Sequence, residues 1–124
     1  MRRALVTVTF LAVTAASHSA CAAGDAAAGL ALFKAKCAIC HSAVAGQNHL
    51  GPSLFGVVGR RAGTAPGYSY SEANKTSGKT WDDATLDTYL TNPKALVPGT
   101  KMMFPGLPDA TDRGNVIAYL DTLK

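Results

Sequence analysis

The amino-acid sequence predicts an all-α fold made of a few helices and long loops. No segment of the 124 residues alternates apolar and polar side chains with the period of two that a half-buried strand shows. Three short stretches instead place helix-forming residues behind a side chain that can cap a helix. The remainder is interrupted by many of the 12 glycines, and the chain length allows one domain.

The first expected helix covers residues 26–35. It consists mostly of alanine and leucine, which are good helix formers, and the carboxylate of Asp25 can cap its first turn. Gly29 lies in its interior, where glycine costs about 1 kcal/mol relative to alanine. We therefore expect another element to approach this helix closely at Gly29.

A second helix is expected over residues 84–90, with Asp82 or Asp83 as its cap. It should end at Asn92-Pro93, because the residue before a proline is pushed out of helical geometry. We expect the segment 97–108 to be a loop. A last helix, capped by Asp109 or Thr111, carries one apolar stripe formed by Val116, Ile117, Leu120 and Leu123.

The motif Cys37-Ala38-Ile39-Cys40-His41 has the C-x-x-C-H spacing of a c-type haem attachment site. Each thiol can form a thioether with one haem vinyl group, and the histidine can supply an axial ligand to the iron. Two alternatives use the same residues. Cys37, Cys40 and His41 could bind zinc together with His49, or the two cysteines could form a redox-active dithiol.

The stretch 42–78 shows neither helical nor strand periodicity. A loop of this length in a compact domain is usually functional, and wrapping a haem is such a function. Apolar side chains such as Leu54, Val57 and Val58 would then face the ring rather than water.

The N-terminus has the layout of a secretory signal, with arginines at 2–3, an apolar run over 4–16 and small residues up to Ala23. We expect residues 1–23 to be a cleaved signal peptide and residues 24–124 to form the exported, periplasmic domain. The apolar run is too short for a membrane span, which needs about 20 residues. Cys21 leaves lipidation as the alternative.

The candidates for the second axial ligand are Met102, Met103, His18, His49 and the lysines. His18 would be lost with the signal, and His49 follows His41 so closely that its loop would have to cross the haem edge. Met102 lies in a proline- and glycine-containing loop, and Met103 follows it directly. An ordinary packing role for either methionine is not excluded by periodicity.

From residue 24 to residue 124 the chain resembles class I, mitochondrial-type cytochrome c, and it is similar to the soluble bacterial members of that family. The matching segments follow the order of the family along the chain. They are Lys36-Cys37-Ala38-Ile39-Cys40-His41, Gly51-Pro52-Ser53-Leu54, Ala65-Pro66-Gly67-Tyr68, Ala73-Asn74, Thr80-Trp81, Tyr89-Leu90, Asn92-Pro93-Lys94, Pro98-Gly99-Thr100-Lys101-Met102 and Ile117-Ala118-Tyr119-Leu120.

The resemblance implies a small cytochrome c fold, with three to five helices and long loops wrapped around one covalent haem c. Cys37 and Cys40 would hold the haem, with His41 as the proximal ligand and Met102, rather than Met103, as the distal one. The other implied site residues are Pro52, whose carbonyl would accept from His41; Arg60, Tyr70 and Trp81 near a propionate; and Asn74, Tyr89 and Thr100 near the methionine sulfur.

The resemblance also supplies a reason for the helical glycine, because Gly29 and Phe33 would pack against Tyr119 and Leu120. Three features depart from the family pattern. The loop after His41 is one residue shorter than in animal cytochromes c, Ala95 stands where a lysine is common, and Gly106-Leu107-Pro108-Asp109 lacks the usual lysine run.

With both axial positions filled by protein, the implied function is single-electron transfer and not enzymatic catalysis. A haem enzyme with an open sixth position, such as a peroxidase, is the alternative. Expected partners are membrane complexes, namely a quinol-cytochrome c oxidoreductase and a cytochrome c oxidase or photosynthetic reaction centre, contacted through Lys36, Lys94 and Lys101 around the haem edge. The net charge of +4 falls to +2 without the signal arginines, which argues against nucleic acid, and we expect a monomer.

Overall fold

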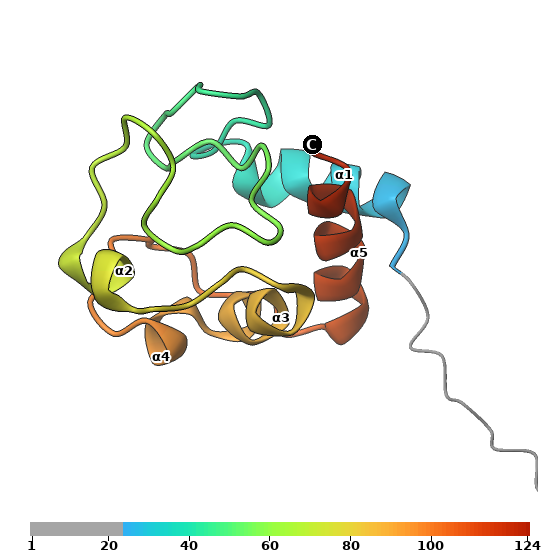
Figure 1. The fold of residues 1–124 in the computed structure, drawn as a ribbon. Coiled ribbons are helices and arrows are strands. Elements are labelled where there is room, and N and C mark those ends of the chain that lie inside the picture. The colour runs from blue at the N-terminus through green and yellow to red at the C-terminus, as the bar shows by residue number, and fades with distance from the viewer. Residues whose placement is uncertain (1–23) are drawn as a thin grey trace, which may run out of the picture.

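The computed structural model describes residues 24–124, so the expected signal peptide lies outside the described residues. Within 24–124 the chain is helical and contains no strand, apart from one isolated antiparallel bridge between Arg61 and Thr80. Long loops connect the helices (Figure 1). In chain order the elements are α1 (Ala26–Leu32), the π-helical segment η1 (Phe33–Cys37), α2 (Glu72–Thr76), α3 (Asp83–Thr91), α4 (Pro93–Leu96) and α5 (Ala110–Asp121).

Helix α1 begins where the sequence predicts. The carboxylate of Asp25 accepts from the backbone N–H groups of Ala27 and Ala28, at 2.8 and 3.2 Å. The regular helix stops at Leu32 and continues as the π-helical segment η1, which ends at Cys37. Single π-helical turns are often found at functional sites, and this one delivers the first cysteine of the motif.

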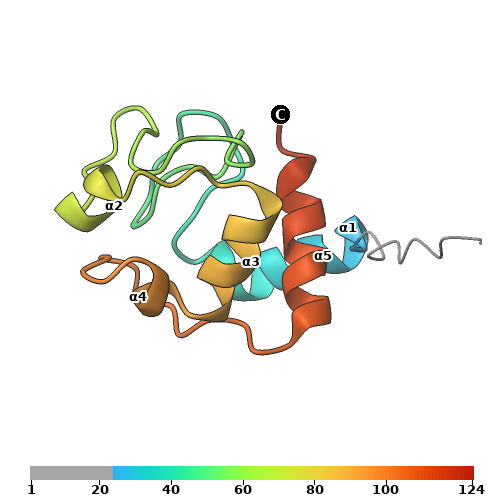
Figure 2. The same ribbon diagram turned by 60° about the horizontal axis from the view of Figure 1, so that its bottom comes forward.

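Helices α1 and α5 pack against each other, which Figure 2 shows as a crossing of the first and last helices. Their contact depends on Gly29, because a Cβ atom at this position would overlap the backbone carbonyl of Asn115. Beside it, the rings of Phe33 and Tyr119 lie 5.1 Å apart, centroid to centroid. The close approach predicted at Gly29 is confirmed.

The caps of α3 and α5 also follow the sequence. Asp82 accepts from the N–H of Thr85 at 2.8 Å, and Asp109 accepts from the N–H of Asp112 at 2.9 Å. Helix α3 ends before Pro93, as predicted, but Asn92 then caps the short helix α4 through the N–H of Ala95. Helix α4 was not predicted.

The expectation of a loop throughout 42–78 was wrong in one part, since residues Glu72–Thr76 form α2. Ser71 caps it by accepting from the N–H of Asn74. The rest of this stretch is held by backbone hydrogen bonds to distant segments, including Gly59 N–H to Trp81 O at 2.9 Å and Gly56 N–H to Leu123 O at 2.6 Å. These bonds fix the long loop to the residues just before α3 and just after α5.

The apolar core brings together the inner faces of the helices and a few loop residues. None of the helices described in 24–124 is long and apolar enough to cross a membrane. The buried core residues are Phe33, Val57, Ala62, Trp81, Leu86, Tyr89, Leu90, Val97, Leu107, Val116, Ile117 and Leu120.

Candidate cofactor site

The two cysteines of the motif lie at the end of the first helical segment as free thiols. Burial, followed by the neighbouring Cys40, raises the pKa of Cys37 to about 11. Burial thus favours the neutral form of the Cys37 thiol. Within residues 24–124, no three His, Cys, Asp or Glu side chains gather as possible metal ligands.

His41 is held by a hydrogen bond from its ring to a backbone carbonyl. Its Nδ1 lies 2.8 Å from the carbonyl oxygen of Pro52, the contact that the resemblance implies. A carbonyl can only accept, so Nδ1 carries the proton and Nε2 keeps its lone pair for a metal. Burial lowers the pKa of His41 below its ordinary value, while the hydrogen bond to Pro52 opposes that shift. The ring is thus a neutral, oriented imidazole.

The ring of His41 also packs against the backbone of Gly51. A Cβ atom at Gly51 would overlap the imidazole, so this position tolerates no side chain without movement. The Gly51 N–H donates to the carbonyl of Cys40 at 2.8 Å, which ties the loop back to the motif. The orientation of His41 is therefore set by backbone on two sides.

Met102 lies in a polar cluster that differs sharply from the environment of Met103. The hydroxyl of Tyr89 donates to the Met102 sulfur at 3.4 Å, and the Met102 side chain is partly buried. The Met103 side chain is 82% exposed. The structure therefore brings Met102, and not its neighbour, into contact with the implied partners.

The hydrogen bonds of this cluster have one consistent direction. Thr100 Oγ1 accepts from Asn74 Nδ2 at 3.2 Å and from the Met102 N–H at 3.3 Å. A thioether sulfur can only accept, so the single hydroxyl proton of Tyr89 is donated to the Met102 sulfur. In the contact between Thr100 and Tyr89, at 3.4 Å, Thr100 is therefore the donor. Burial raises the pKa of Tyr89, which keeps this donor protonated.

Arg60 lies on the His41 side. Its terminal nitrogens donate to the carbonyls of Phe55 and Ser53, both at 3.1 Å. Its Nε is buried and has no hydrogen-bond partner. An unpaired buried N–H of a guanidinium is costly, and an anionic group would satisfy it.

Trp81 connects the two sides of the site. Its ring contacts that of Tyr89, with centroids 4.6 Å apart, and its backbone N–H donates to the Arg60 carbonyl at 2.9 Å. The hydroxyl of Tyr70 accepts from the N–H of Ala65 at 3.2 Å, and its ring packs edge-on against Tyr68. The predicted site residues thus form two groups, around His41 and around Met102, joined through Trp81.

The three lysines expected at the haem edge are all exposed. Lys36 lies in η1 and Lys94 in α4, while the Lys101 ammonium donates to the carbonyl of Ser69 at 3.4 Å. This bond ties the loop before Met102 to the long loop. Lys36 thus directly precedes Cys37 and Lys101 directly precedes Met102, whereas Lys94 lies farther along the chain from both.

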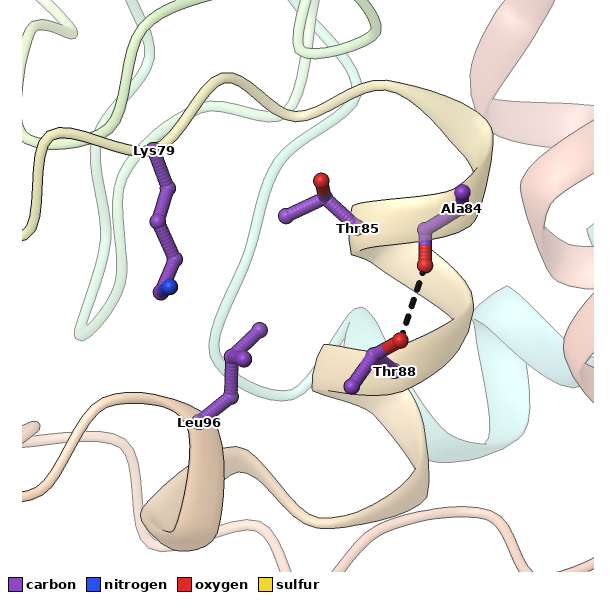
Figure 3. A pocket seen from close by; sticks show the side chains of 5 residues that line it. All are labelled: Lys79, Ala84, Thr85, Thr88 and Leu96. Carbon is purple, nitrogen blue, oxygen red and sulfur yellow. Dashed lines mark hydrogen bonds between the residues drawn. The ribbon is translucent and has the colours of Figure 1, made fainter.

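An open surface pocket of about 260 Å³ lies elsewhere, beside α3. Figure 3 shows its lining side chains, Lys79, Ala84, Thr85, Thr88 and Leu96. The hydroxyl of Thr88 is already used, because it donates to the Ala84 carbonyl at 3.0 Å within the helix. None of these residues belongs to the predicted site, so this pocket is separate from it.

Sequence reasoning missed Asn48, which joins two loops. Its amide nitrogen donates to the Pro66 carbonyl at 2.9 Å, and its oxygen accepts from the Ser53 N–H at 2.9 Å. An asparagine in a glycine-rich loop ordinarily indicates only a turn. Its position four residues before Pro52 was the available signal.

Comparison with known proteins agrees with this geometry. The family model described as cytochrome c matches residues 26–124. Cytochrome c2 of Rhodoblastus acidophilus is 55% identical over 103 residues, covering 82% of this chain and 95% of the relative. Cytochrome c2 of Rhodopila globiformis is 52% identical over 101 residues, with the same coverage of 82% and 95%.

A solved structure supports the fold as well. Cytochrome cH from Methylobacterium extorquens superimposes with a TM-score of 0.75 at 51% sequence identity, covering 80% of this chain and 99% of that structure. Together with the cysteine motif and the oriented histidine, these matches settle the family. The chain belongs to the cytochrome c family, whose members bind one covalent haem c and act as electron carriers rather than enzymes.

Proposed function

We propose that this protein is a soluble periplasmic carrier that holds its haem through Cys37 and Cys40, with His41 and Met102 as axial ligands. The observation that carries the ligand assignment is the contrast between the two methionines. Met102 is partly buried and accepts a hydrogen bond from Tyr89, whereas Met103 projects into solvent. A ligand needs a fixed sulfur, and only Met102 has one.

The residues present fit the cofactor. Two free thiols stand beside an imidazole whose Nε2 is available, and the buried Nε of Arg60 can bond a propionate. When bound, the haem supplies a one-electron Fe(III)/Fe(II) couple. With His41 and Met102 in the two axial positions, substrate has no open coordination site, which supports electron transfer as the reaction.

The protein groups around Met102 tune that couple. A thioether ligand favours the ferrous state and raises the potential, as for Met/His ligation in cytochromes c generally. The bond from Tyr89 withdraws electron density from the sulfur and acts in the same direction. The buried rings of Trp81 and Tyr89 exclude water from this side, which limits reorganisation during transfer.

The distribution of exposed charges indicates which kind of partner surface this protein binds. Lys36, Lys94 and Lys101 are exposed near the segments that would surround the haem. Such a basic surface steers transient encounter with acidic faces, and we propose that these belong to a quinol-cytochrome c oxidoreductase as donor and to a cytochrome c oxidase or photosynthetic reaction centre as acceptor. The arginines and apolar run of residues 1–23 support export to the periplasm.

The experiment that tests the ligand assignment compares Met102→Ala with Met103→Leu. Met102→Ala should abolish the absorption band near the red end of the oxidised spectrum that marks sulfur-ligated ferric haem. It should also lower the potential and allow cyanide to bind. Met103→Leu exchanges apolar side chains of similar volume and should leave band and potential nearly unchanged. The reverse pattern would refute the assignment.

The alternative of a haem peroxidase predicts a different result. In that case the unmodified protein would bind cyanide or peroxide as readily as Met102→Ala does, because its sixth position would already be open. Slow ligand binding by the unmodified protein, together with an intact sulfur band, would exclude it.

A further inference from the structure

A hydrogen-bonded path leads from Asn48 to the imidazole of His41 through a single peptide group. Asn48 Oδ1 accepts from the N–H of Ser53 at 2.9 Å. The carbonyl of the same peptide group is that of Pro52, whose oxygen lies 2.8 Å from His41 Nδ1. The N–H and C=O of one peptide unit are conjugated, so a hydrogen bond at one end strengthens the bond at the other.

The orientation of the Asn48 amide is determined by its second contact. Its nitrogen donates to the carbonyl of Pro66 at 2.9 Å. The Pro66 carbonyl can only accept and the Ser53 amide can only donate, so only one orientation of the side chain satisfies both. The acceptor oxygen is thereby held on the Ser53 N–H.

We propose that Asn48 is a positioning residue that lowers the reduction potential by strengthening the hydrogen bond from His41 to Pro52. This inference rests on the proposed role of His41 as the proximal ligand. A stronger acceptor at Nδ1 gives the imidazole more anionic character and makes Nε2 a better donor. A better donor favours the ferric state, so the potential falls.

A purely structural role for Asn48 must be separated from this one, because Asn48 also joins two loops. The chain offers a matched control in Tyr68. The Tyr68 hydroxyl donates to the Leu50 carbonyl at 2.7 Å and so ties the same two segments, 48–50 and 66–68. It makes no hydrogen bond to the peptide group between Pro52 and Ser53. Tyr68→Phe therefore removes a loop tie of the same kind and leaves the path to His41 intact.

The experiment uses the haem-containing protein with three variants, Asn48→Ala, Asn48→Asp and Tyr68→Phe. Two quantities are measured, the midpoint potential and the NMR resonance of the His41 Nδ1 proton in the reduced, diamagnetic state. Amide exchange of Ser53 serves as a local check.

Asn48→Ala removes the acceptor, so we expect the Nδ1 resonance to move upfield and the potential to rise. The Ser53 amide should exchange roughly five- to tenfold faster, the effect of losing one hydrogen bond. Asn48→Asp loses the bond to Pro66 but retains an oxygen for the Ser53 N–H, so the Nδ1 resonance should stay or move downfield. Its added charge shifts the potential by itself, and the resonance is therefore the quantity to compare. Tyr68→Phe should change neither quantity.

Two results would overturn the inference. If Asn48→Ala leaves the resonance and the potential unchanged, Asn48 only ties the loops. If Asn48→Asp moves the resonance upfield as far as Asn48→Ala does, the bond to Pro66 is what matters. Failure of the proposed function would look different, because His41→Ala would then retain the low-spin spectrum of the unmodified protein.

Discussion

The cluster around Met102 makes a quantitative prediction for Tyr89→Phe. The change removes the proton donated to the sulfur across 3.4 Å and leaves the hydroxyl of Thr100 without its acceptor. A hydrogen bond contributes about 1 kcal/mol net, so the variant should lose about 1 to 2 kcal/mol of unfolding free energy. For a domain of this size each kcal/mol lowers Tm by about 4–8 °C.

The potential should fall as well, because the sulfur regains electron density and donates better to ferric iron. If about half of one hydrogen bond, roughly 0.5 kcal/mol, differs between the redox states, the shift is about 20 mV, since a factor of ten is about 59 mV for one electron. A redox titration beside thermal unfolding measures both. Thr100→Val should be worse in stability, because it leaves N–H groups of Asn74 and Met102 without their acceptor. A rise in potential for Tyr89→Phe would refute the assigned direction of the bonds.

The same tyrosine gives a pH dependence. Because burial raises the pKa of Tyr89, the folded protein keeps a proton that the unfolded chain loses near pH 10. The stabilisation that the protonated Tyr89 contributes is thus complete below pH 10 and is lost as the pH rises above that value. The unfolding free energy of Tyr89→Phe should fall less steeply above pH 10, as denaturant titrations at several pH values would show. An unchanged slope would contradict this.

Three further predictions concern the scaffold and its maturation. Gly29→Ala should lower the free energy of unfolding by about 1–3 kcal/mol, because the new Cβ overlaps α5 even though alanine has the better helix propensity. Gly114→Ala, whose Cβ would have open space around it, should raise that free energy by up to about 1 kcal/mol. Equal melting temperatures of the two variants would contradict this. Cys37→Ala should leave the haem on one thioether or none with loss of folded protein, measured by intact mass and circular dichroism; full helix content in a haem-free form would argue against it. Export should produce a mature chain that begins between Cys21 and Asp25, and a mass that retains residue 1 would point to an uncleaved anchor.

The sequence predicted the parts of the fold that have strong local signals. Asp25, Asp82 and Asp109 were identified as candidate caps because a carboxylate before a helix-forming run has a specific local partner. Helices α2 and α4 were missed because five and four residues are too few to show a 3.6-residue period. The π-helical segment η1 at the end of the first helix could not be predicted from its amino-acid composition.

The residues of the candidate site likewise fall into those that the sequence could identify and those that it could not. His41 could be named in advance from the C-x-x-C-H spacing, and Pro52 from the resemblance to the family. Their proposed roles at the haem stay predictions. Asn48 could not be named, because its importance depends on Ser53 and Pro66, which only the folded loops bring to it. Tertiary hydrogen bonds of this kind have no recognisable pattern in the amino-acid sequence.

The packing of α1 on α5 also has a consequence for the timing of folding during synthesis. The backbone N–H of Asp25 donates to the side chain of Asn115 at 2.8 Å, across 90 positions of the chain. Gly29 packs against Asn115 and Tyr119, which are synthesised long after α1. The contacts between α1 and α5 can therefore form only after α5 has been synthesised, and the core of a nascent chain stays incomplete until then.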